Sequence, residues 1–118
     1  MKKGNFGDMN KFKLIESKEL FEINKGRQNF IETKARKWLL RNRYKINHKL
    51  KKSAKHDEDI RAIFCFNAMN CDWDILKEIS KLIVKNNANY SARCYRADLM
   101  IVELEISVKL GGTFNGTT

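Results

Sequence analysis

The charge of this 118-residue chain is unbalanced, because 24 Lys and Arg residues stand against 14 Asp and Glu residues and leave a formal net charge of +10. The length supports one modest hydrophobic core and excludes two conventional domains. No apolar run approaches the ~18 residues of a membrane span, and the first residues lack the apolar stretch of a signal peptide. We therefore expect one cytoplasmic domain, residues 11–110, between flexible ends at residues 1–10 and 111–118.

The first long predicted element is a helix over about residues 27–45, after one or two possible helical turns that follow Ser17. Apolar residues recur in it at intervals of three and four, which is the spacing of one helix face. That face consists of Ile31, Ala35, Trp38, Leu39 and Asn42 or Ile46.

Residues 33–56 contain ten Lys or Arg residues and no Asp or Glu, so the remaining 14 basic residues balance the 14 acidic ones. The whole net charge therefore lies in this segment, which favours a local surface for a polyanion. Like charges one turn apart destabilise a helix by a few tenths of a kcal/mol per pair, a loss that a bound polyanion would offset. Lys34, Lys37, Arg41 and Lys45 fall on one flank of the predicted helix, and Arg36 and Arg43 point to the other side.

Residues 57–69, DEDIRAIFCFNAM, fit two structures. Ile60, Ile63 and Phe64 have helical spacing behind the acidic residues 57–59, which would open a helix. The aromatic and β-branched residues of IRAIFCF fit a buried strand equally well. The first alternative gives helix, short turn, helix, and the second gives a β-α-β-β sheet domain in the second half of the chain.

A second helix is predicted over about residues 73–86. Asp72 is placed to cap it, and Asp74 lies near the positive end of its dipole. Its apolar face consists of Ile75, Leu76, Ile79, Leu82 and Ile83. The opposite face is expected to expose Lys77, Ser80, Lys81 and Lys85.

Two strand-like runs, residues 90–96 and 99–110, are separated only by Ala97 and Asp98 and predict a β-hairpin. The buried face of the second run is expected to hold Met100, Val102, Leu104, Ile106 and Val108, and the wet face Ile101, Glu103, Glu105, Ser107 and Lys109. In the first run Ala92 and Cys94 should face inward and Ser91, Arg93 and Tyr95 outward, with Arg96 near the tip. Arg93 and Arg96 would then either meet a ligand or pair with Glu103 or Asp98.

If residues 58–69 are helical, the order of elements over about residues 27–108 resembles that of winged helix-turn-helix DNA-binding proteins. The resemblance implies an α+β fold in which residues 73–86 form the second helix of the helix-turn-helix and the hairpin forms the wing. Small basic members of this class include transcriptional regulators and accessory proteins that mark the transfer origin of Gram-positive conjugative plasmids. The resemblance therefore implies one of these two roles.

Candidate catalytic groups are few. His48 and His56 lie outside the paired-His spacing of metal-dependent rolling-circle nucleases, and Glu103 and Glu105 have no nearby Asp and Lys in a nuclease pattern. No Gly-rich loop precedes a helix to cradle phosphate. The three cysteines, Cys65, Cys71 and Cys94, form no CxxC pair and are expected to be reduced thiols without a metal.

We therefore expect a protein without catalytic activity, cofactor or metal that binds duplex DNA and has no membrane partner. The predicted contact residues are Lys34, Lys37, Arg41, Arg43, Lys45, Lys77, Ser80, Lys81, Arg93, Tyr95 and Arg96. Symmetric DNA sites favour dimeric proteins, so a homodimer is compatible with this function, although no coiled-coil pattern or exposed apolar strip in the sequence fixes an interface. The alternatives are an RNA-binding α+β domain or a small basic ribonuclease toxin, which would surround a scissile phosphate with Arg, Lys, His and Tyr.

Overall fold

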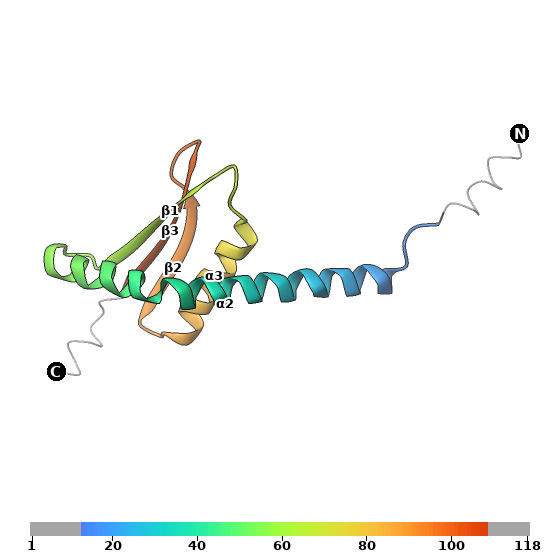
Figure 1. The fold of residues 1–118 in the computed structure, drawn as a ribbon, viewed down its shortest axis with the longest axis horizontal. Coiled ribbons are helices and arrows are strands. Elements are labelled where there is room, and N and C mark those ends of the chain that lie inside the picture. Colours follow the sequence, from blue (N-terminus) through green and yellow to red (C-terminus); the bar gives the residue numbers. More distant parts are fainter. Residues whose placement is uncertain (1–12, 109–118) are drawn as a thin grey trace, which may run out of the picture. The chain divides into compact units, whose positions relative to one another are not determined.

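The computed structural model describes residues 13–108, and in this range it contains two helices and three strands (Figure 1). The elements are α2 (Ser17–His56), β1 (Arg61–Asn67), α3 (Trp73–Asn86), β2 (Tyr90–Arg96) and β3 (Ile101–Val108). The expected flexible ends, residues 1–10 and 111–118, lie outside the described residues. The chain divides into two compact units between Phe30 and Ile31, and each unit is described by itself.

Helix α2 is longer than the sequence pattern predicted, because it begins at Ser17 and ends at His56 instead of covering about residues 27–45. The chain contains no proline, and Gly26 lies within the helix without ending it. The buried side chains continue beyond residue 45 with Leu50 and Ser53. At the C-terminal end, the Ser53 hydroxyl lies 2.8 Å from the Asp57 carboxylate and the Asp57 backbone N–H donates to the Ser53 carbonyl.

Residues 61–67 form strand β1, so the helical alternative for residues 57–69 is wrong and the strand alternative is confirmed. The reason is non-local, because β1 pairs antiparallel with β3 along its whole length, with Phe64 opposite Leu104. Within the described residues the first helix of a helix-turn-helix is therefore missing. The second half of the chain has the predicted β-α-β-β order, and the α+β class is confirmed.

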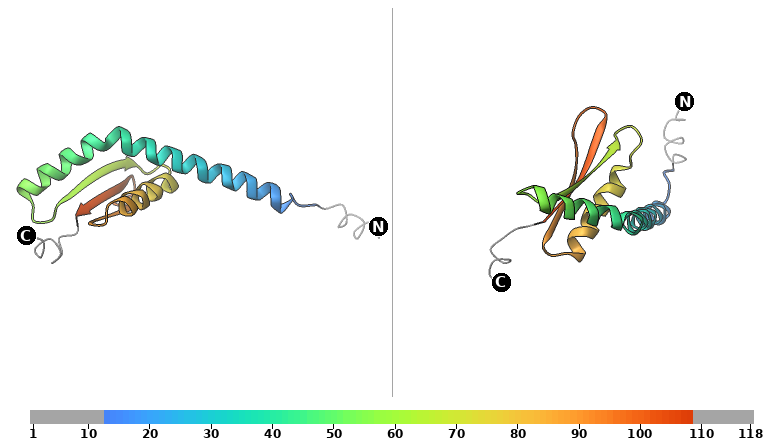
Figure 2. Two further views of the ribbon diagram at one scale, coloured as in Figure 1. Left: turned by 90° about the horizontal axis from the view of Figure 1, so that it is seen from below. Right: turned by 60° about the vertical axis from the view of Figure 1, so that its left-hand side comes forward.

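The three strands form one antiparallel sheet in the order β1-β3-β2, with β3 in the centre (Figure 2). One face of the sheet is apolar and packs with side chains of α2 residues 31–56 and of α3 in a single core. Its most deeply buried large side chains are Ile79, Val102, Leu104 and Ile106. Trp38 of α2 packs edge-on against Phe64 of β1 at a centroid distance of 5.1 Å, which fixes this part of the helix against one edge strand.

Helix α3 and the β2–β3 hairpin agree with the sequence predictions in most respects. The Asp72 carboxylate caps α3 by accepting the backbone N–H groups of Asp74 and Ile75. Three side chains differ: Ser80, Met100 and Glu105, of which Glu105 is buried on the outer face of the sheet. Ser80 is buried, because this side of α3 lies against β2, where Ser80 and Ala92 line the same shallow depression. Met100 is exposed, because β3 begins one residue later and Met100 belongs to the turn.

Candidate nucleic-acid interface

One flank of α2 carries a continuous row of cations, which we call the basic stripe. At about 100° per residue, its members share one side of the helix, next to the buried face. They are Lys34, Lys37, Arg41, Lys45, Lys52 and Lys55, with His48 filling the interval between Lys45 and Lys52, and all of them are exposed. The row extends over about 30 Å of helix axis. Four of these residues were predicted, and the same spacing continues through the two lysines that the prediction omitted.

The C-terminal end of the basic stripe borders a hollow of about 430 Å³ between α2 and β1. The hollow is lined by Lys49, Lys52, Ser53, His56, Asp57, Arg61, Ala62 and Ile63. The Lys49 ammonium also lies 5.3 Å from the centroid of the Phe64 ring, an attraction between a cation and an aromatic face. Three of the four side-chain types expected for a ribonuclease, arginine, lysine and histidine, thus lie around one hollow, whereas no tyrosine lines it.

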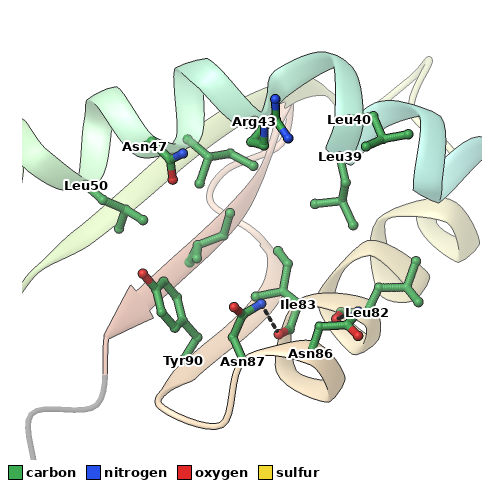
Figure 3. Close-up of a pocket in the computed structure, with 12 residues that line it drawn as sticks. Leu39, Leu40, Arg43, Asn47, Leu50, Leu82, Ile83, Asn86, Asn87 and Tyr90 are labelled. Atoms are coloured by element: carbon green, nitrogen blue, oxygen red, sulfur yellow. Dashed lines mark hydrogen bonds between the residues drawn. The ribbon is translucent and has the colours of Figure 1, made fainter.

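The opposite flank of α2 borders a groove of about 470 Å³ between α2, α3 and the start of β2 (Figure 3). Leu39, Ile46, Leu50, Leu82, Ile83 and Ile106 give the groove its apolar lining. Arg43 stands on the α2 side, and Asn87 and Tyr90 stand on the other side, where the Asn87 amide donates to the Ile83 carbonyl. Arg43 was predicted among the DNA contacts, and the structure separates it from the basic stripe.

The residues predicted on α3 do not form one exposed group. Lys77 and Lys81 are exposed, as expected. Ser80 is buried, and its hydroxyl donates to the Leu76 carbonyl at 3.2 Å within the same helix. The expectation that α3 exposes Ser80 is therefore wrong, and the contact of Ser80 with DNA stays a prediction.

On the hairpin, the outer face of the sheet is an ion-pair network. Glu105 of β3 is only 7% exposed, although the sequence predicted a wet position, because Arg61 and Arg93 from the two neighbouring strands cover it. Arg93 Nε donates to Glu105 Oε1 at 2.7 Å and Arg61 Nη1 donates to Oε2 at 3.1 Å. Tyr95 donates its hydroxyl hydrogen to Glu103 at 2.7 Å, and Arg96 donates to the Leu99 carbonyl. Arg93, Tyr95 and Arg96 therefore already have protein partners.

These contacts shift the protonation equilibria of the outer face. The hydrogen bond from Arg93 is the main cause that lowers the pKa of Glu105, and Arg61 adds to it. The hydrogen bond to Glu103 raises the pKa of Tyr95 above its ordinary value. Glu105 is thus held ionised and Tyr95 is held protonated, which is the behaviour of a network that stabilises the sheet.

Burial raises the pKa of Cys94, and Cys65 is an exposed thiol. In residues 13–108 no three His, Cys, Asp or Glu side chains gather as ligands for a metal ion. Within the same range, neither α2 nor α3 combines the length and the apolar character that a membrane crossing requires.

Residues 31–108 thus define an α+β domain in which two helices and a three-stranded antiparallel sheet enclose one core, with a row of cations on the longer helix. No protein-family model, curated protein or solved structure matches the chain.

Proposed function

We propose that this protein binds nucleic acid without cleaving it and that the basic stripe of α2 contacts the phosphate backbone. One observation carries the proposal. Six cations lie on the same exposed flank of a single helix, and α2 contains no acidic residue after Glu32. Phosphate contacts of this kind supply most of the sequence-independent affinity for nucleic acids.

We propose duplex DNA as the first target, because a straight row of cations is suited to the regular phosphate spacing of a duplex. A winged-helix mode would add α3 in the major groove and the β2–β3 hairpin as the wing. In that mode Lys77 and Lys81 remain available for contacts, whereas Ser80 does not. The absence of a first helix before α3 in residues 57–72 argues for backbone contacts rather than helix-turn-helix readout. Roles as a transcriptional regulator or plasmid transfer-origin accessory protein remain predictions.

The test is a competition experiment with labelled duplex DNA at two salt concentrations, using unlabelled duplex DNA, single-stranded DNA, RNA and polyglutamate as competitors. The proposal expects duplex DNA to compete best and polyglutamate to compete poorly at equal charge concentration. If polyglutamate competes as well as duplex DNA, the stripe binds polyanions in general and has no preference for nucleic acids. Failure of every nucleic acid to bind at low salt would refute the proposal.

The groove of Figure 3 favours single-stranded nucleic acid as a second candidate. Arg43 stands beside an apolar lining, and Tyr90 supplies an aromatic ring on the opposite wall, which is the combination on which unstacked bases are held. Tyr90→Leu should then weaken RNA binding, while Tyr44→Leu at an exposed position outside this groove should not. Equal affinities of the two variants for RNA would remove this candidate.

The same RNA samples test the ribonuclease alternative. If the wild-type protein shortens RNA on a denaturing gel and the His56→Ala variant does not, the hollow between α2 and β1 is a catalytic site. Intact RNA after prolonged incubation with the wild-type protein supports binding without cleavage.

A further inference from the structure

The N-terminal segment of α2, residues 17–30, carries the densest group of exposed apolar side chains in the described part of the chain. Leu20, Phe21, Ile23 and Phe30 are 49, 70, 60 and 47% exposed. Every residue from 13 to 30 is exposed, so residues 13–108 bury none of these side chains. At about 100° per residue Leu20, Ile23 and Phe30 share one side of the helix, and exposed apolar side chains grouped in this way mark an interaction site.

The spacing of these residues is suited to a helical partner. Leu20, Ile23, Arg27 and Phe30 follow one another at intervals of three, four and three, which places them along one seam of the helix. The Arg27 guanidinium lies 5.8 Å from the centroid of the Phe30 ring, so even the charged member of the seam packs on an aromatic side chain. A seam of this type is buried when a second helix lies alongside it.

The charges of the segment identify the partner. Residues 17–22 contain two glutamates and one lysine, a net charge of −1, and residues 23–30 contain Lys25 and Arg27, a net charge of +2. The helix dipole accounts for Glu19 in the first turn of α2 but not for the two cations, because the helix continues to His56. A segment with one acidic half and one basic half is complementary to an antiparallel copy of itself.

We infer that residues 17–30 are a dimerisation segment that packs antiparallel against the same segment of a second copy of this chain. The acidic half of each copy lies against the basic half of the other, and the seam of Leu20, Ile23 and Phe30 is buried between them. A membrane surface fits less well, because helices that lie on membranes carry Lys and Arg on the polar face, whereas residues 17–30 have two glutamates against three basic residues and a net charge of only +1. The inference does not depend on nucleic-acid binding.

The experiment is a charge exchange between two variants, read as molar mass by light scattering after size exclusion. Variant one is Glu19→Lys with Glu22→Lys, and variant two is Lys25→Glu with Arg27→Glu. The wild-type protein should have the mass of two 13.9-kDa chains, whereas each variant alone should be a monomer at the same concentration. An equimolar mixture of the two variants should again have the mass of two chains, because opposite charges then meet along the whole segment.

Two further variants distinguish dimerisation through the seam from non-specific hydrophobic association. Leu20→Ser with Ile23→Ser should raise the dimer dissociation constant at least tenfold, whereas Leu40→Ser, at a 72% exposed position outside the segment, should leave it unchanged. A monomeric wild-type protein at ~100 μM, or variants that stay dimeric alone and fail to prefer each other when mixed, would overturn the inference. Sedimentation of a monomeric wild-type protein with phosphatidylcholine–phosphatidylserine vesicles, lost in the Leu20→Ser, Ile23→Ser variant, would assign the segment to a membrane surface instead.

Discussion

Two double variants on opposite flanks of α2 test the basic stripe. Lys37→Ala with Arg41→Ala removes two members of the stripe, and Arg36→Ala with Arg43→Ala removes two exposed cations outside the stripe, of which Arg43 lines the groove. Both variants lose the same charge from the same helix, so a general effect of net charge is equal in both. Only the geometry of the contact with nucleic acid distinguishes them.

The expected size follows from counterion release. If all six stripe cations neutralise phosphates of duplex DNA, the slope of log affinity against log salt is about −5.4, because each contact contributes about −0.9. A fourfold rise in salt, from about 50 to 200 mM, then weakens binding by a factor of about 1,800. Removing Lys37 and Arg41 leaves four contacts and a slope of about −3.6, so the same rise in salt weakens binding by a factor of only about 150.

The assay is fluorescence anisotropy of a labelled duplex of arbitrary sequence at four or more salt concentrations. The slope of the Arg36→Ala, Arg43→Ala variant should match that of the wild-type protein. If the slope of log affinity against log salt becomes equally less steep in both variants, the assignment of the phosphate contacts to one flank is refuted. An unchanged slope in the Lys37→Ala, Arg41→Ala variant would leave the stripe as a solvated helix face.

Three further outcomes are expected from the fold. Leu104→Ala, at a completely buried position in the central strand, should lower the free energy of unfolding by about 2–5 kcal/mol in urea titrations, whereas Leu99→Ala, 82% exposed, should change it by less than about 0.5 kcal/mol. Because its pKa is lowered in the folded protein, Glu105 stabilises the fold above the ordinary carboxyl pKa, and this contribution is lost as pH falls through the lowered value. In the Glu105→Gln variant the free energy of unfolding should therefore fall less steeply as the pH is lowered into the acid range. Iodoacetamide followed by mass spectrometry should modify the exposed Cys65 faster than Cys94, whose pKa is raised by burial.

The elements that the sequence predicted correctly are those with local signals. Helix α3 has a capping aspartate, an apolar face and a following break within one short segment, and its predicted limits at 73 and 86 agree with the structure. The β2–β3 hairpin has regular alternation and a short connection. For residues 61–67 the local pattern suited a helix and a strand equally, and pairing with β3, which lies far along the chain, decided between them.

The candidate site was predicted less completely, because it depends on the length of α2 and on contacts across strands. The prediction ended the helix near residue 45, so Lys52 and Lys55 were not assigned to the stripe, although they continue the same spacing. Alternation along β3 placed Glu105 on the outer face correctly. It could not show that Arg61 and Arg93, from two different strands, would cover that carboxylate.

A final prediction concerns the cost of placing six cations on one helix flank. Arg41 has Lys37 and Lys45 at i−4 and i+4, and each like-charge pair at this spacing destabilises a helix by about 0.2–0.5 kcal/mol. Arg41→Ala should therefore stabilise the fold by about 0.4–1 kcal/mol at low salt while it weakens DNA binding. Gln28→Ala, at an exposed uncharged position on the same helix, controls for the helix propensity of alanine, because glutamine and arginine have nearly equal helix propensities. Because salt screens the repulsion between exposed charges, the gain beyond that control should vanish in thermal unfolding at about 1 M salt. A gain of equal size at both salt concentrations, or a loss of stability, would show that the stripe carries no repulsion for a polyanion to relieve.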